Sequence, residues 1–457
     1  MTDLSRRAFL QRSAALGIVG GAAPFVMNLA AIGEAAAATA SDYKALVCIF
    51  LFGGNDYANT VSPYDQASYD LYAANRGTIA HPRDSLTATL LNPNNPLSGG
   101  RQFALAPNLA PLVPIFNAGR LGVVLNVGAL VMPTSKSNYQ NKSVPLPPKL
   151  FSHNDQQSFW QASSPEGATS GWGGRIGDLL QSGNGAAALT CISASGNSVY
   201  LAGRSAIQYS VSTTGPIPLL NNQTTLFGSA TGMSALRGLM TAPRTHLFEN
   251  EHATVTRRSL DLQAQVTASL AAAPAIATPF PANNSLADQL RIVLRLISVS
   301  QELGAKRQVF FVSLGGFDTH DSVLTTHPVL MTRLAAAMRY FYDASVELGI
   351  ANRVTAFTGS DFGRTLTSNA NGSDHGWGSH HFVMGGAVNG RAFYGNPPAI
   401  ANNGPDDVGQ GRLLPSLAVD QYGSTLANWF GVTAGQMSTV LPNINNYNPS
   451  TWNLGFV

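Results

Sequence analysis

Residues 308–357 of the chain read QVFFVSLGGFDTHDSVLTTHPVLMTRLAAAMRYFYDASVELGIANRVTAF, and they decide the fold class. This stretch predicts a strand at 308–314, a helix at 328–348 with apolar residues at helical spacing, and a strand at 353–357. Another helix is predicted just upstream, at 286–303. Helix, strand, helix and strand in this order are typical of an α/β protein with a parallel, doubly wound sheet.

The upstream part of the chain adds two strands to this sheet. A continuous apolar run at 44–52 ends in a Gly-Gly turn at 53–56, and a second run follows at 121–127. Such runs are typical of strands that are buried on both faces. Residues 186–285 instead hold short strands and turns, a helical stretch at 234–270 and a Pro/Ala linker, so we expect an insertion or cap there.

The first forty residues have the pattern of a twin-arginine signal peptide. An arginine pair at 6–7 precedes a weakly hydrophobic stretch at about 14–32, and a run of alanines at 35–38 offers a cleavage site. A membrane anchor is the alternative, because the apolar stretch approaches the ~20 residues that span a bilayer. We expect cleavage after Ala38 or Ala40. The twin-arginine machinery would export the protein to the periplasm or the medium, with no stable membrane span after cleavage.

Charge and cysteine content limit the partners of the remaining domain, residues 41–457. The chain has 27 basic and 24 acidic residues, of which residues 1–40 take three and two, so the domain carries a net charge of +2. With 11% charged residues overall, this near-balance argues against a nucleic-acid partner. Cys48 and Cys191 lie in apolar runs, which favours two buried thiols over a disulfide.

Acidic residues follow three of the predicted strands. These residues are Asp56, Asp318 and Asp361. Because ligands bind beyond the carboxyl ends of parallel strands, we expect these side chains to share a cleft. Further candidates come from the loops downstream of residue 318: His320, Asp374, His375, His380 and His381. Carboxylates and imidazoles together predict a divalent metal site, with zinc, manganese, magnesium and calcium all open.

Several short motifs carry a resemblance to a known family. They are Gly-Gly-Asn-Asp at 53–56, Phe-Ser-His-Asn-Asp-Gln-Gln at 151–157, Gly-Trp-Gly-Gly-Arg at 171–175, Gly-Gly-Phe-Asp-Thr-His at 315–320, Ser-Asp-Phe-Gly-Arg at 360–364 and Asp-His-Gly at 374–376. As a set they resemble a family of secreted bacterial proteins, domain of unknown function 1501, which is grouped with the alkaline phosphatase and sulfatase superfamily. The resemblance implies an α/β/α sandwich, metal ligands at strand ends and a hydrolytic site.

The resemblance also implies metal-binding roles for single residues. Asp56 matches the first-strand metal aspartate of the superfamily. Asp318 and His320 resemble its Asp-x-x-x-His pair at shorter spacing, and Asp361 matches the aspartate of its Asp-His element, although a phenylalanine follows it here. We therefore expect the missing imidazoles from His375, or from His380 and His381.

Three residues are candidates for the chemistry itself. Ser152 would be the nucleophile, with His153 or Asp155 as further metal ligands; alternatively, Ser152 is the N-cap of a helix that begins at His153. Arg175 and Arg364 would hold an anionic ester oxygen, because a guanidinium group binds such oxygens through paired hydrogen bonds. Alternatively, either arginine pairs with a structural carboxylate.

These features predict an exported, metal-dependent hydrolase of phosphate or sulfate esters. The alternative is a non-catalytic binding or assembly protein that retains the fold, because the sequence does not decide the nucleophile. A redox protein is disfavoured, since the chain has no Cys-x-x-Cys-His haem motif and no Gly-x-Gly-x-x-Gly motif after a strand.

The Arg6→Lys, Arg7→Lys double variant should remain in the cytoplasm, because the export machinery recognises the arginine pair. The wild-type exported protein should begin near Thr39 or Ser41. Cell fractionation with N-terminal sequencing checks both outcomes. An exported form that still carries its first thirty residues would contradict the predicted cleavage.

Overall fold

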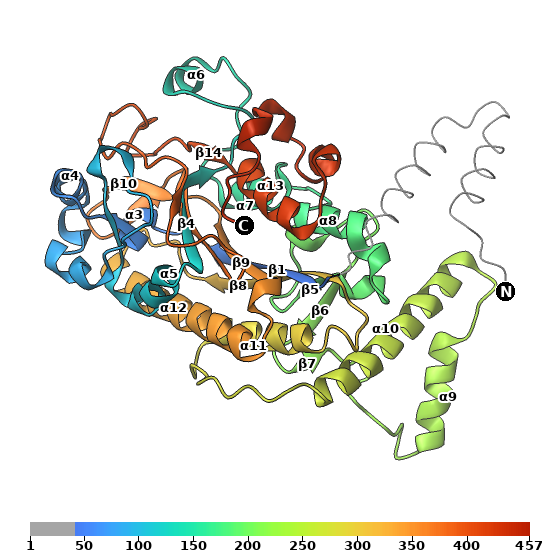
Figure 1. The fold of residues 1–457 in the computed structure, drawn as a ribbon. Helices are drawn as coiled ribbons and strands as arrows, with labels where there is room; N and C mark the ends of the chain where they lie inside the picture. Colours follow the sequence, from blue (N-terminus) through green and yellow to red (C-terminus); the bar gives the residue numbers. More distant parts are fainter. Residues whose placement is uncertain (1–41) are drawn as a thin grey trace.

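The computed structural model describes residues 42–457, so the signal peptide predicted at 1–40 lies outside the described residues. Its centre is a ten-stranded sheet (Figure 1). The order across this sheet is β13 (Phe393–Tyr394), β4 (Leu121–Gly128), β12 (Ser379–Gly385), β9 (Val354–Ser360), β1 (Lys44–Phe52), β8 (Arg307–Gly315), β5 (Cys191–Ser193), β6 (Gln208–Ser212) and β7 (Gly215–Pro216), with β14 (Leu417–Ala418) beside β4. Most neighbours are parallel; β12 and β7 are antiparallel to theirs.

Strand β1 lies in the middle of the sheet, where its apolar residues are buried. It pairs in parallel with β8 on one side and β9 on the other, so Val47 lies opposite both Phe310 and Ala356. A strand with neighbours on both sides and helices on both faces buries every side chain, which explains its continuous apolar run. The strands predicted at 44–52, 121–127, 308–314 and 353–357 are confirmed as β1, β4, β8 and β9.

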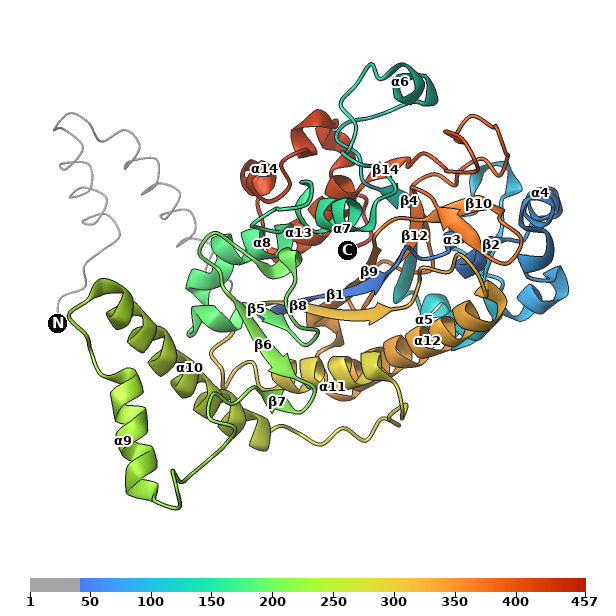
Figure 2. The same cartoon turned by 180° about the vertical axis from the view of Figure 1, so that it is seen from behind.

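Helices cover both faces of the sheet (Figures 1 and 2). The covering helices are α11 (Ser285–Ser298) with α12 (Val323–Glu347) on one face, and α8 (Trp172–Leu180) with α13 (Val419–Phe430) on the other. Alternate side chains of β1 enter the two layers, Val47 on the first face and Leu46 on the second. Cys48 and Cys191 are buried free thiols in the second layer. The predicted α/β/α sandwich with a mostly parallel sheet is confirmed.

Residues 186–285 hold both an edge of the sheet and a helical extension. Strands β5, β6 and β7 continue the sheet beyond β8. Helices α9 (Ala230–Thr241) and α10 (Leu247–Ala271) project from that edge, where α10 contacts β7 (Figure 2). The helical stretch predicted at 234–270 is confirmed as two helices, which are separated near Pro243 because this residue has no backbone N–H for a helical hydrogen bond.

Shorter elements connect these layers. They are α3 (Tyr57–Thr60), α4 (Gln66–Arg76), α5 (Val113–Asn117), α6 (Lys136–Asn141), α7 (His153–Ala162) and α14 (Met437–Val440), with the two-stranded ribbons β2 (Val61–Pro63)–β3 (Phe103–Leu105) and β10 (Arg364–Ser368)–β11 (Ser373–His375). None of the helices within residues 42–457 is long and apolar enough to cross a membrane. Helix α7 and the β10–β11 ribbon matter most for function, because both supply histidines to the edge of the sheet.

Candidate metal centre

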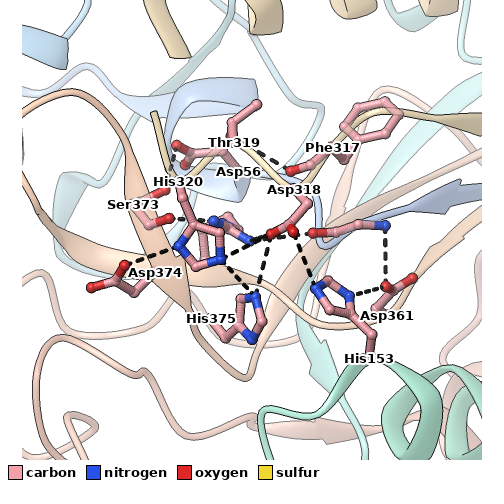
Figure 3. A network of polar contacts seen from close by, with 12 residues as sticks. Asp56, His153, Phe317, Asp318, Thr319, His320, Asp361, Ser373, Asp374 and His375 are labelled. Atoms are coloured by element: carbon pink, nitrogen blue, oxygen red, sulfur yellow. Dashed lines mark hydrogen bonds and ion pairs between the residues drawn. The ribbon is translucent and has the colours of Figure 1, made fainter. Parts of the chain in front are cut away.

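The candidate site lies at the carboxyl ends of the neighbouring strands β9, β1 and β8 (Figure 3). Asp361 follows β9 directly, Gly53 follows β1, and Asp318 lies in the loop after β8. Helix α7 begins with His153, and β11 ends with His375. Because parallel strands end at one edge of the sheet, residues far apart in the sequence meet there.

Asp318 is the centre of this site. Its Oδ1 atom lies 3.1 Å from His320 Nε2 and 3.3 Å from His375 Nε2, and its Oδ2 atom lies 3.4 Å from His153 Nε2. Three imidazole nitrogens from three separate segments therefore converge on one carboxylate (Figure 3). The Asp318 side chain is 45% exposed, so a ligand from solvent has access to it. The structure thus brings together three residues that the sequence predicted: Asp318, His320 and His375.

The opposite nitrogen of each ring, Nδ1, donates to a fixed acceptor. The pairs are His153 with Asp361 Oδ2 (2.6 Å), His320 with Asp374 Oδ1 (3.1 Å), and His375 with the backbone oxygen of Phe151 (2.7 Å). Because Nδ1 carries the proton in these bonds, each neutral ring has its lone pair on Nε2. A histidine that binds a metal typically has its second nitrogen held in this way.

When all three rings are neutral, no Nε2 atom carries a proton that would make its contacts favourable. His320 Nε2 and His375 Nε2 are only 2.9 Å apart, and both face the Asp318 carboxylate. His153 Nε2 is buried without a hydrogen-bond partner among the described residues. Lone pairs that face one another and a carboxylate repel, so the arrangement requires a proton or a metal cation between them. His153, His375 and Asp318 each offer a ligand atom within 4.8 Å of the others, a cluster that can hold a metal ion.

Arg364 holds Asp318 in place, and the structure does not leave it free for a substrate. Its guanidinium is fully buried and donates to Asp318 Oδ1 (2.8 Å), to the backbone oxygen of Gly53 (3.3 Å) and to that of Ser373. Burial alone raises the pKa of Asp318, but the Arg364 contact lowers it below its ordinary value. The prediction that Arg364 binds an ester oxygen is therefore wrong. The alternative, that it pairs with a carboxylate, is what the structure shows: Arg364 positions Asp318.

Asp361 and Asp374 support the histidines of the site. Asp361 Oδ2 accepts from His153 Nδ1, from Gln157 Nε2 (2.8 Å) and from the backbone N–H of Gly53 (3.1 Å). Its hydrogen bond raises the pKa of His153 above the ordinary value. Asp374 Oδ1 accepts from the ring of His320 in the same way. Both were predicted as metal ligands; in the structure, one oxygen of each carboxylate instead accepts from the Nδ1 atom of a histidine.

Asp56 belongs to the fold and not to the centre. Its carboxylate forms an ion pair with Arg76 in which both side chains are fully buried, and it also caps α3 by accepting from the backbone N–H of Asn59 (3.3 Å). Removing one partner of a buried pair typically costs about 3–5 kcal/mol, because the other charge stays buried. The predicted metal role of Asp56 is therefore replaced by a stabilising one.

His380 and His381 are core residues of β12. His380 Nδ1 accepts from the backbone N–H of Asn126 (3.0 Å), and His381 Nδ1 is 3.3 Å from Thr358 Oγ1. Both rings are buried against aromatic side chains, and this burial lowers the pKa of each to about 3. They were predicted as ligands on a loop; the chain instead forms a strand there, which turns both imidazoles into the sheet layers.

Arg175 and Ser152 are also engaged elsewhere. Arg175 is buried and donates to three backbone oxygens, those of Val440 (2.8 Å), Ala162 (2.8 Å) and Ser170 (3.3 Å). Ser152 directly precedes α7, as predicted for an N-cap residue, but its hydroxyl donates to Asp155 Oδ2 (3.0 Å) and makes no capping bond to the backbone. Neither residue contacts the Asp318 centre.

His153 is the site residue that the sequence analysis ranked too low. It was considered only as an optional ligand beside Ser152, with Asp155 as the alternative. Gln157 lies four residues after His153 and therefore on the same face of α7, and both side chains donate to Asp361. A second polar residue at this spacing is the sequence feature that could have pointed to His153.

Comparison with known proteins identifies the family. A family model described as "Protein of unknown function (DUF1501)" matches residues 43–410, most of the chain. The chain belongs to the DUF1501 family. The resemblance predicted from its motifs is therefore confirmed at the level of the family, and the Asp318 centre of this DUF1501 protein lies within the matched residues. No functionally curated protein matches the chain.

Solved structures with a related arrangement are distant from this DUF1501 protein. One is Ps i-CgsB in complex with k-i-k-neocarrahexaose, with 9% identity and a TM-score of 0.36 over 90% of this chain and 78% of the other. Another is a mutant of the alkaline phosphatase PafA, with 10% identity and a TM-score of 0.28 over 71% of this chain and 64% of the other. Scores this low carry no argument about activity.

The Asp361→Asn substitution should lower the pKa of His153 in the metal-free protein, because a neutral amide replaces the carboxylate that accepts from Nδ1. The wild-type pKa is raised, so this contact stabilises the fold at low pH and its contribution is lost as the pH rises through the folded-state pKa. NMR titration of the ring measures the change, and Asp321→Asn is the control. An unchanged His153 pKa in Asp361→Asn would contradict the arrangement.

Proposed function

We propose that this protein binds a divalent metal through His153, His320, His375 and Asp318 and hydrolyses phosphate or sulfate esters there. The observation that carries the proposal is the 2.9 Å contact between two Nε2 atoms whose Nδ1 protons are already donated elsewhere. A cation between the rings would remove the repulsion between the two Nε2 lone pairs, because it would be coordinated by both of them. The residues present therefore fit a metal.

The donor set favours zinc or a similar transition metal. Imidazole nitrogen is a preferred ligand of such ions, whereas magnesium and calcium prefer oxygen donors. Three imidazoles and one carboxylate are a ligand set of the zinc type. Of zinc, manganese, magnesium and calcium, which the sequence left open, this ligand set favours zinc. Loading of a metal before transport is also consistent with the export of a folded precursor that we propose from the arginine pair at 6–7.

The chain contributes orientation and access. Asp361 and Asp374 fix the tautomer and the direction of their histidines, and Arg364 fixes the carboxylate of Asp318 from below the surface. A bound divalent ion would supply Lewis-acid chemistry at an ester oxygen and would lower the pKa of a water molecule. The Ser152 hydroxyl hydrogen-bonds to Asp155 and has no contact with Asp318 or the three histidines, so water is a better candidate nucleophile than this serine.

Titration calorimetry of metal-free protein should show tighter binding of Zn²⁺ than of Mg²⁺ or Ca²⁺, with release of protons below neutral pH. Removing a ligand in His153→Ala or Asp318→Asn should weaken zinc binding by at least 100-fold. Asp374→Asn should weaken it by about 10–100-fold, since it only orients His320. His252→Ala, an exposed histidine on α10, is the matched control. Wild-type zinc affinity in both ligand variants would contradict the proposed centre.

Zinc-loaded protein should hydrolyse an aryl phosphate or an aryl sulfate, and Asp318→Asn should abolish this turnover. Ser152→Ala should change the rate by no more than a few-fold if water is the nucleophile; complete loss with metal retained would assign the attack to Ser152 instead. Zinc-replete wild-type protein that is inactive on a broad panel of esters would overturn the hydrolase proposal in favour of the non-catalytic alternative.

A further inference from the structure

A cavity of about 300 Å³ lies beside the metal centre. Its lining comes from helix α7, from Phe52 at the end of β1 and from residues 197–199 in the loop after β5. It thus lies at the same carboxyl edge of the sheet as Asp318, the edge at which α/β proteins bind their ligands. Its volume is at the lower end of the range of small-molecule sites.

One face of α7 joins this cavity to the centre. Asn154, Gln157, Ser158 and Gln161 line the cavity, and their spacing places them on one face of the helix. Gln157 donates to the same Asp361 oxygen that orients His153. Gln157 therefore belongs both to the cavity lining and to the hydrogen-bond network that orients His153.

The amide side chains in the cavity each have one end fixed and the other end available. The fixed ends are Asn154 Nδ2 on Glu166 (3.2 Å), Gln157 Nε2 on Asp361 (2.8 Å), Gln161 Oε1 on the N–H of Tyr200 (3.0 Å) and Asn197 Oδ1 on Gln208 (3.1 Å). The available ends are two acceptors, the side-chain oxygens of Asn154 and Gln157, and two donors, the side-chain nitrogens of Gln161 and Asn197. A group that is both donor and acceptor suits this mixture, and hydroxyl groups are of that kind.

The cavity lining offers no cationic side chain to an anion. Glu166 is its one charged lining residue, and it is acidic. Phe52 adds an apolar surface, which the C–H face of a sugar ring can cover. Several hydroxyls around an apolar face are the chemistry of a neutral sugar.

We propose that this cavity binds the neutral sugar part of a sugar phosphate or sugar sulfate whose charged group lies at the Asp318 centre. The inference rests on the proposed ester hydrolysis and adds the substrate class to it. The geometry that supports this proposal is the set of amide side chains on α7, the helix that also carries His153. Each of them has one polar atom in a hydrogen bond and the other available to a ligand.

Binding of sugars tests the cavity without turnover. Zinc-loaded wild-type protein is mixed with methyl glycosides of glucose, galactose, mannose and N-acetylglucosamine, and saturation-transfer NMR reports which of them bind. At least one should bind, and the Asn154→Ala, Asn197→Ala double variant should weaken that binding by about tenfold, since it removes two neutral hydrogen bonds. Asn95→Ala, an exposed asparagine elsewhere, is the control.

Turnover then separates this inference from the proposed function. The double variant should lower kcat/KM for the sugar ester about tenfold and leave that for an aryl ester unchanged. Sugar binding without hydrolysis of any ester would refute the hydrolase and keep the cavity assignment. Hydrolysis of aryl esters with no sugar bound, or with equal sugar binding by wild type and double variant, would overturn the cavity assignment alone.

Discussion

Three imidazole Nε2 atoms face the carboxylate of Asp318, and lone pairs at these distances repel unless a cation lies among them. Several surrounding groups hold the three histidines and Asp318 in this arrangement. Each ring has its Nδ1 proton taken by a separate acceptor, and Arg364 fixes the central carboxylate from the buried side. Two protons would relieve the same contacts, one between His320 and His375 and one on His153 Nε2 facing Asp318, whereas one metal ion would serve all three nitrogens.

The sheet makes this convergence possible. Strand β1 is buried between β8 and β9, so the loops that follow all three strands end side by side. The buried Asp56–Arg76 pair fixes the turn after β1, and Gly53 in that turn donates to Asp361. The polar network at the surface is thus hydrogen-bonded to the backbone of this turn, and the buried ion pair fixes the turn. A site supported by strands and helices in this way is positioned more precisely than a site built on loops alone.

Periodicity and strand order were enough to predict the parallel, doubly wound sheet and to place Asp318, His320 and His375 at one edge, and the family resemblance implied the sandwich. The loops were harder, because a carboxylate after a strand is equally suited to bind a metal, to orient a histidine or to pair with an arginine. Asp361, Asp374 and Asp56 took the latter two roles, which only side-chain contacts reveal. His380 and His381 were placed in a loop because Gly-Trp-Gly-Ser precedes them, but pairing with β4 and β9 makes that stretch a strand.

Anomalous X-ray diffraction at the zinc edge tests the central claim most directly. Crystals of the exported protein grown with zinc should show one strong anomalous peak among the Nε2 atoms of His153, His320 and His375, with Asp318 as the oxygen ligand. Asp361 and Asp374 should remain on the Nδ1 side of their histidines. Peaks only at surface histidines such as His252, with the Nε2 atoms of His320 and His375 still in contact and no ion among the three rings, would contradict the account.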